Sequence, residues 1–130
     1  LCAAQWHKEL TYKDDFFGDG LKYDNDFNME FGYTPPYQAA ESSAALLVFK
    51  DAFERANSFD TGKVRDALAK TDMQTFYGNI KFGSGGQNTA KPMVLFQVRC
   101  EGDTCENRLV APTKWASHKL VHPVPKWSER

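Results

Sequence analysis

The sequence predicts an α/β fold with about three helices and about four strands. Two apolar runs rich in strand-forming residues, Phe76–Phe82 and Met93–Val98, flank a loop rich in glycine and amide side chains. The chain before these runs carries mostly helical periodicity, which is strongest between Tyr37 and Ala56. The chain after them has the pattern of extended structure. Helices should therefore precede the two runs and strands should follow them.

The composition is that of an ordinary globular domain. The chain has 130 residues, of which 42% are hydrophobic and 25% are charged, so it is long enough to bury a core. A formal charge of −1 gives no electrostatic basis for binding nucleic acid or an anionic membrane. No apolar run reaches transmembrane length, and the first four residues are too short for a secretion signal. Because the chain begins abruptly on an apolar segment, we expect either a removed signal with more protein upstream, or a fragment.

The first elements are a short strand and an aromatic helix. Leu1–Trp6 is apolar and is expected to end a strand, whereas Lys13–Gly18 is expected to be irregular. Between Asp19 and Phe31 aromatic residues recur at a spacing of four, which places them on one helical face. Gly32 stands where a helix would end.

Two further helices are predicted. The longest runs from Tyr37 to Ala56, and its inward face is expected to carry Ala44, Ala45, Val48, Phe49, Ala52 and Phe53. Asp60 or Thr61 can cap the next helix, whose buried stripe consists of Val64, Ala67 and Leu68.

The C-terminal part is predicted to contain a β-hairpin. Met93–Cys100 and Cys105–Ala111 flank a four-residue loop that includes a glycine. The almost unbroken run Met93–Val98 is typical of a strand buried on both faces rather than an edge strand. Cys100 and Cys105 would face each other across the hairpin. They could form a disulfide or remain as two unpaired thiols, and the sequence pattern allows both alternatives. Cys2 would stay unpaired.

The remaining residues give little support for a metal site or an enzyme. After Pro112 the chain is expected to form an ordered strap over a surface, carrying Trp115, His118, His122 and Trp127. The two histidines of that strap would share a face only in a helix, which Pro123 disfavours, so we expect no metal site. The run Gly83-Ser84-Gly85-Gly86 lacks the lysine and the following helix of a phosphate-binding loop. No hydrolase or zinc-protease motif occurs. The sequence therefore predicts neither an enzyme nor a cofactor.

Several short motifs, taken in order, resemble one known family. They are Gln5-Trp6-His7, Phe31-Gly32-Tyr33-Thr34-Pro35, Tyr77-Gly78-Asn79-Ile80-Lys81-Phe82, Gly86-Gln87-Asn88, Lys91-Pro92-Met93 and Pro123-Val124-Pro125-Lys126-Trp127. Together they resemble the C-terminal third of periplasmic (type I) solute-binding proteins of the branched-chain amino-acid type, which serve ATP-driven (ABC) importers. The resemblance extends from about residue 3 to the last residue.

The resemblance implies part of a two-lobe fold. Residues 1–6 would end a strand of the second lobe. Residues 7–90 would form first-lobe helices, a strand and a hinge crossing, and residues 91–130 would form the second-lobe hairpin and C-terminal strap. Because Gly83–Lys91 would carry the chain between the lobes, we expect Gly85 or Gly86 to adopt a positive φ.

The resemblance also implies a function. Such proteins bind a small polar solute, commonly an amino acid, between their lobes and pass it to a membrane permease. It implies a periplasmic or otherwise extracytoplasmic location, where a Cys100–Cys105 disulfide would persist. The candidate ligand contacts are Trp6, Tyr37, Glu41, Ser42 and Ser43. The alternatives are that Trp6 and Tyr37 belong to the core and that Glu41 is a solvated acid at a helix start.

A second hypothesis is a stand-alone interaction or assembly module that keeps the fold elements without a complete ligand site. Most of the groups that bind a zwitterion in such receptors lie on segments with no counterpart in this chain. Uncovered apolar faces would then associate with a missing N-terminal portion or with a second copy.

Overall fold

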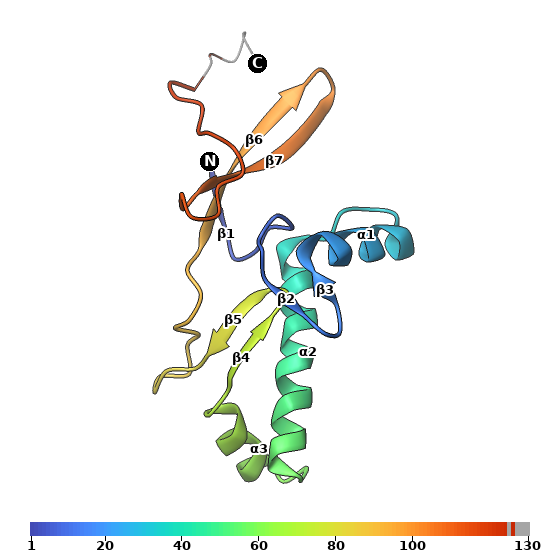
Figure 1. Cartoon of the computed structure of the whole chain (residues 1–130), viewed down its shortest axis with the longest axis vertical. Coiled ribbons are helices and arrows are strands. Elements are labelled where there is room, and N and C mark those ends of the chain that lie inside the picture. Colours follow the sequence, from blue (N-terminus) through green and yellow to red (C-terminus); the bar gives the residue numbers. More distant parts are fainter. Residues whose placement is uncertain (125, 127–130) are drawn as a thin grey trace.

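The computed structural model describes residues 1–124 and 126. Pro125 and Trp127, which belong to the last motif and to the expected strap, lie outside the described residues. The described chain has a mixed α/β architecture with three helices and seven short strands (Figure 1). This confirms the predicted class and the number of helices, whereas the strands are more numerous than predicted.

The first helix, α1, spans Gly20–Phe31 and has a defined cap at each end. The Asp19 side chain accepts a hydrogen bond from the Lys22 amide at 2.8 Å, which satisfies one free N–H of the first turn. Gly32 ends the helix in the left-handed region, with φ 77°, and its amide donates to the Asn28 carbonyl. The spacing of the aromatic residues and the position of the glycine therefore predicted this helix correctly.

The longest helix, α2, spans Tyr37–Ala56, as predicted. Its buried face is a stripe of small residues at a spacing of four: Ala40, Ala44, Val48 and Ala52. The prediction that Ala45, Phe49 and Phe53 face inward was wrong, because these three are exposed. The stripe is narrower than periodicity suggests because, within the described chain, α3 (Thr61–Leu68) and the hairpin of β4 (Asp72–Thr75) and β5 (Gly78–Lys81) lie along one side of this helix (Figure 1).

The third helix, α3, spans Thr61–Leu68 and packs on the end of α2. Asp60 is its N-cap and accepts from the Lys63 amide at 2.9 Å. Val64 and Ala67 pack against Ala52 in a small second core. The predicted cap at Asp60 and the burial of Val64 and Ala67 are confirmed, whereas Leu68 is half-buried against this core.

Two small hairpins were not predicted. β2 (Lys13–Asp14) pairs with β3 (Gly18–Asp19), where the sequence had suggested irregular structure. The Asp14 carboxylate organises this turn, because it accepts from the Phe16 and Phe17 amides at 2.9 and 2.7 Å. Its other oxygen accepts from the Phe76 amide at 2.6 Å, a contact between residues 62 positions apart.

The second hairpin joins β4 (Asp72–Thr75) to β5 (Gly78–Lys81). The apolar run Phe76–Phe82 thus contains the strand β5, but its first two residues, Phe76 and Tyr77, form the turn before that strand. Both side chains are nonetheless buried, and Phe76 has no exposed surface. The burial of aromatic rings, rather than strand alternation, explains the apolar character of the run.

A three-stranded antiparallel sheet forms the other end of the molecule. It has the order β1–β6–β7, with β1 spanning Cys2–Ala4, β6 Val94–Glu101 and β7 Thr104–Ala111. β6 is central, as predicted, but it is not buried on both faces, since Val94 and Gln97 are buried while Leu95 and Val98 are exposed. An antiparallel sheet can pack one face on the core and leave the other open.

The C-terminal chain crosses this sheet. The buried Gln97 side chain accepts from the Val121 amide at 3.0 Å and donates to the Val121 carbonyl at 3.1 Å. The Trp115 ring lies 5.8 Å from that of Tyr12. The described part of this segment is thus fixed by both a polar and an aromatic contact.

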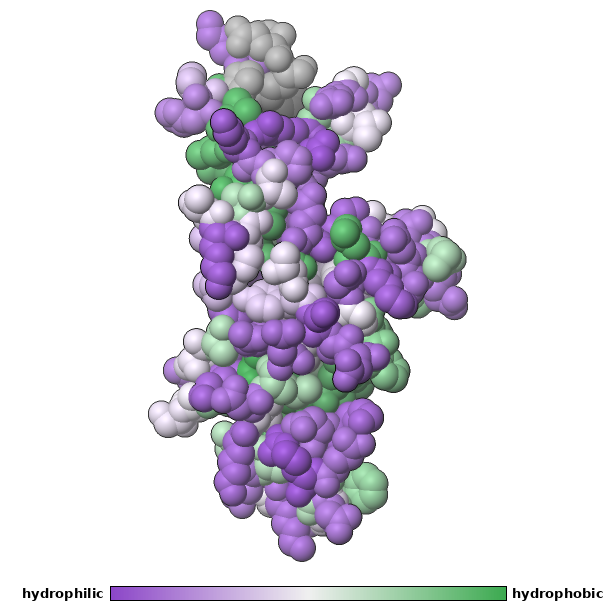
Figure 2. Space-filling view, in the orientation of Figure 1, coloured by the Kyte–Doolittle hydropathy of each residue, from purple (hydrophilic) through white to green (hydrophobic). Residues whose placement is uncertain are grey.

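One core joins the sheet to the helices. Ala4, Val94 and Leu109 of the sheet belong to the same buried cluster as Tyr23 of α1 and Ala44 of α2. Figure 2 shows that hydrophobic residues (green) are also exposed between hydrophilic ones (purple) on the side of the molecule seen in this view. Within the described residues, no helix is both long and apolar enough to cross a membrane.

Cys100 and Cys105 form a disulfide across the β6–β7 hairpin, which confirms the predicted pairing, and Cys2 is free and exposed. We therefore expect one reactive thiol per chain in oxidised protein under denaturing conditions. Titration with a thiol reagent, followed by peptide mapping of the labelled residue, measures this number and its position. Three reactive thiols in protein kept under oxidising conditions would contradict the prediction.

Gly86 has φ 81°, which confirms the expected positive φ in the loop between β5 and β6. No atom lies within 4 Å of the place that a Cβ would take at this position, so only the backbone conformation disfavours a side chain. Replacing Gly86 with valine should lower the free energy of unfolding by about 1 kcal/mol or more. Gly85→Val is the matched control in urea denaturation, because Gly85 lacks a positive φ. Equal stability of the Gly86 variant and the unmodified chain would show that the conformation of this loop does not contribute to the stability of the fold.

Candidate functional site

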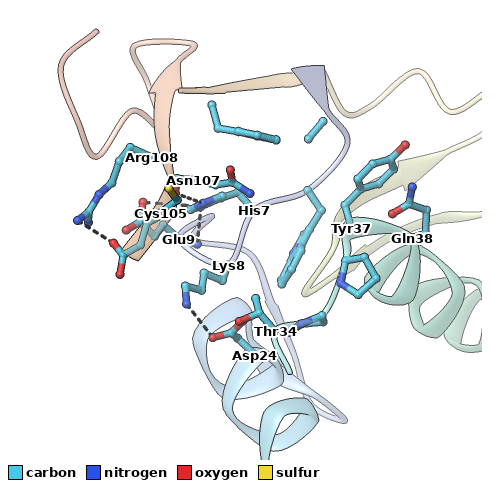
Figure 3. Close-up of a pocket in the computed structure, with 16 residues that line it drawn as sticks. His7, Lys8, Glu9, Asp24, Thr34, Tyr37, Gln38, Cys105, Asn107 and Arg108 are labelled. Atoms are coloured by element: carbon cyan, nitrogen blue, oxygen red, sulfur yellow. Dashed lines mark hydrogen bonds and ion pairs between the residues drawn. The ribbon is translucent and has the colours of Figure 1, made fainter. Parts of the chain in front are cut away.

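A polar cavity lies beside the β1–β6–β7 sheet, where this sheet meets the part of the chain that contains the three helices, residues 13–81. We call residues 13–81 the helical part. Two connectors join the β1–β6–β7 sheet to the rest of the chain: residues 5–12 after β1 and residues 82–93 before β6. The cavity has a volume of about 560 Å³ and is open on one side. Its lining comes from β1 and the first connector, from α1, from the start of α2 and the residues before it, from Phe96 of β6 and from β7 (Figure 3). It therefore collects residues from five separate parts of the sequence.

Trp6 forms an apolar wall of this cavity and is held firmly. Its ring makes edge-on contacts with Tyr23 and Phe76, with centroids 5.8 and 6.1 Å apart. The indole N–H donates to the Phe76 carbonyl at 3.4 Å. Trp6 is only 4% exposed, so it belongs to the core as well as to the cavity lining.

His7 joins the first connector to β7. Its Nε2 lies 3.0 Å from the Asn107 carbonyl, and its Nδ1 lies 3.3 Å from the Glu9 amide. A carbonyl can only accept and an amide N–H can only donate, so we infer the neutral tautomer with the proton on Nε2. Burial lowers the pKa of His7, and this outweighs the hydrogen bond to Asn107 and the nearby Glu9 carboxylate.

The pH dependence of stability should report this histidine. Because the pKa is lowered on folding, the unfolded chain binds the extra proton first, and the stabilisation is lost as pH falls below the ordinary value of 6.5. We expect the free energy of unfolding to fall more steeply there for the unmodified chain than for His7→Gln. Glutamine can still donate to the Asn107 carbonyl but does not titrate. Parallel pH profiles for the two proteins would contradict the assignment.

Charges of both signs line the cavity. Lys8 Nζ lies 2.9 Å from Asp24 Oδ2, and the Asp24 side chain is only 10% exposed. The other carboxylate oxygen, Asp24 Oδ1, is buried without a hydrogen-bond partner in the described chain. On β7 Arg108 pairs with Glu106 at 2.7 Å. The cavity can thus offer a carboxylate to a cation and N–H donors to an anion.

The five predicted contacts do not gather in one place. Trp6 and Tyr37 line this polar cavity. Glu41 instead lines a second, mainly apolar cavity of about 510 Å³ between α2, α3 and β5. Ser42 is exposed, and the Ser43 hydroxyl lies 2.9 Å from the Tyr23 hydroxyl.

Sequence reasoning missed most of the polar lining. His7 stood inside a motif, but Lys8, Asp24, Asn107 and Arg108 had no pattern that set them apart. The signal for Asp24 is its place beside Tyr23, on the aromatic face of α1. Arg108 and Asn107 alternate across β7, so their roles depend on the register with β6.

The described residues contain no group of three or more His, Cys, Asp or Glu side chains that could hold a metal ion. His118 of the strap lies 3.3 Å from Arg108 and 2.9 Å from the Ser117 hydroxyl, while His122 is exposed.

No family model matches this chain. Its fold is similar to that of a solved leucine-binding protein, LivK from Thermotoga maritima, with a TM-score of 0.64 and 21% sequence identity. The similarity covers 86% of this chain but only 31% of that protein, so the chain spans about a third of its length. The predicted class, part of a periplasmic-binding-protein-like α/β fold, is thereby confirmed as a fold. This structural neighbour is a binding protein.

Proposed function

We propose that this chain forms part of an extracytoplasmic receptor that binds an amino-acid-like solute for an ATP-driven importer. The observation that carries the proposal is the polar cavity between sheet and helical part, with charges of both signs. The fold shared with part of a leucine-binding protein supports it independently.

The chemistry of the cavity suits a zwitterion. A buried ammonium group needs a carboxylate, and Asp24 has one oxygen that accepts no hydrogen bond in the described chain. A buried carboxylate needs N–H donors, and both Arg108 and Lys8 line the cavity. The rings of Trp6 and Tyr37 provide an apolar surface for the remainder of the ligand. Glu41, Ser42 and Ser43 are less suited, because they line other surfaces.

The finer assignments belong to the same proposal. The chain would correspond to the C-terminal third of such a receptor, with residues 1–6 and 91–130 in the second lobe and residues 7–90 in the first. The pairing of β1 with β6 supports this division. The disulfide is compatible with an oxidising, periplasmic compartment. A membrane permease would be the partner.

The alternative, an assembly module without a complete ligand site, has one observation in its favour. Phe49, Phe53 and Phe59 form a row of exposed aromatic side chains at the end of α2, with ring centroids 6.2 and 5.4 Å apart. Surfaces of this kind are typical of protein contacts.

Titration of the ¹⁵N-labelled chain with leucine, lysine and glutamate, followed by NMR, tests the proposal. We expect the largest shift changes at the Trp6 indole and at the amides of His7, Asp24 and Asn107. N-acetylleucine amide, which lacks both charges, should have much smaller effects. Asp24→Asn should abolish the changes, whereas Asp26→Asn, an exposed acid two residues away on the same helix, should not. Changes confined to other surfaces would contradict the proposed site.

A further inference from the structure

Lys91 connects the two segments that link the sheet to the helical part. It lies in the second connector, just before β6, and its ammonium group donates to the Gln5 carbonyl in the first connector. These residues are 86 positions apart. The same nitrogen lies 3.5 Å from the centre of the Tyr77 ring, in cation–π geometry. One side chain therefore contacts both connectors and the turn between β4 and β5.

The Lys91 stem packs over the backbone of Gly78. Gly78 has φ 144°, a conformation that disfavours a side chain. A Cβ at this position would also overlap Lys91 Cδ and would lie only 2.7 Å from Lys91 Cε. The lysine stem thus lies directly over a backbone position whose conformation favours glycine.

The electrostatic surroundings are unusual for a lysine. Burial lowers the pKa of Lys91 to about 7, although the Glu41 carboxylate of α2 favours the cation. Tyr77 remains neutral, because burial and then the charges of Glu41 and Tyr37 raise its pKa. Gln5 contributes a neutral carbonyl. A neutral amine can still donate to that carbonyl, and it avoids the cost of burying a charge.

We propose that Lys91 is a positioning residue that fixes the two connectors to each other and so sets the angle between the β1–β6–β7 sheet and the helical part. Its relevance to ligand binding rests on the proposed function, because the polar cavity lies between these same two parts. The orientation itself does not depend on any ligand.

Proton linkage gives the direction of the pH effect. A solvated lysine has a pKa of 10.5, and the buried one has a pKa of about 7. In the fixed arrangement Lys91 is buried and contacts Gln5, whereas in a relaxed arrangement it is solvated. Between about pH 7 and pH 10.5 the fixed arrangement binds fewer protons than the relaxed one, so rising pH favours the fixed arrangement. Below pH 7 both arrangements are protonated, and the fixed one is at its weakest relative to the relaxed one.

Pulsed electron–electron distance measurement tests the proposal on the chain without ligand. Spin labels are attached to a keto-bearing non-natural residue at positions 63 and 103, which are exposed on α3 and at the β6–β7 turn. The label chemistry leaves Cys2 and the disulfide intact. The variants are Lys91→Met, which keeps an apolar stem but has no donor, and Lys91→Arg, which keeps the donors but does not titrate. Lys81→Met, at an exposed lysine of β5, is the matched control.

For the unmodified chain we expect the distance distribution to narrow as pH rises from about 6 to about 9. Lys91→Met should broaden the distribution at every pH without lowering the melting temperature, because it removes a buried charge together with the hydrogen bond. Lys91→Arg should resemble the unmodified chain at low pH and should not respond to pH. Lys81→Met should behave as the unmodified chain does.

Two results would overturn the proposal. One is a Lys91→Met distribution as narrow as that of the unmodified chain, and the other is equal broadening by Lys81→Met. A distribution that stays constant with pH in the unmodified chain would overturn the proton-linked part, and this measurement needs no variant to fold. Because the measurement uses no ligand, a failure here is distinct from a failure of the NMR titration.

Discussion

Replacing Phe76 with alanine is expected to lower the free energy of unfolding of the chain by about 3–5 kcal/mol. Phe76 has no exposed surface, and its ring lies 4.3 Å from Tyr23 and 5.1 Å from Phe17, between centroids. Truncation of a buried phenylalanine costs about 3–5 kcal/mol, because packing is lost and a cavity remains. Small domains are stabilised by about 5–15 kcal/mol in total, so this is a large share.

Urea denaturation followed by circular dichroism measures this loss. Phe59→Ala is the control, because Phe59 is 87% exposed and its removal should change stability by about 0.5 kcal/mol or less. If Phe76→Ala were as stable as Phe59→Ala, the aromatic cluster around Trp6 would not be the centre of the core.

The isolated chain, as a monomer, is expected to bind amino acids only with a dissociation constant of about 1 mM or weaker, equivalent to about −4 kcal/mol. The polar cavity is open on one side, so a zwitterion would have to satisfy its charges partly with water. Asp24 is already engaged by Lys8, and Arg108 by Glu106, so a ligand must replace existing ion pairs. A buried charge left unpaired costs several kcal/mol, which removes most of the gain from contact.

Calorimetry with leucine, valine and a panel of other amino acids measures this affinity. Light scattering on the same sample is the control, because exposed apolar residues could produce a dimer with a more complete site. Micromolar binding by a strictly monomeric chain would show that the cavity is already sufficient. Together with the NMR titration, this separates a weak site from an absent one.

The helices could be predicted closely because their determinants are local. The bounds of α2, Tyr37–Ala56, follow from periodicity and the prolines before it, and the caps of α1 and α3 are Asp19 and Asp60 in the sequence itself. The β6–β7 hairpin and its disulfide likewise depend on neighbours within a few residues.

Elements that depend on distant contacts were predicted poorly. The β2–β3 hairpin depends on Asp14, whose carboxylate also accepts from the Phe76 amide 62 positions later. The exposure of Phe49 and Phe53 depends on what covers α2, which periodicity cannot show.

The polar cavity is a further case. Its histidine pairs with Asn107, 100 positions away, so no local pattern could join them. Trp6 and Tyr37 were proposed by resemblance and do line this cavity, whereas the acids and the arginine that give it its charge were found only in the structure.

The contact between Gly78 and Lys91 has an evolutionary consequence. A single substitution at position 78 would force a side chain against the lysine stem, at 2.7 Å from Lys91 Cε, in addition to straining the backbone. A shorter residue at position 91 would relieve the clash but would also lose the bond to the Gln5 carbonyl. A change at either position alone therefore has a cost, which is backbone strain at position 78 and the lost hydrogen bond at position 91. In diverging relatives we expect glycine and lysine at these two positions to be kept or replaced as a pair.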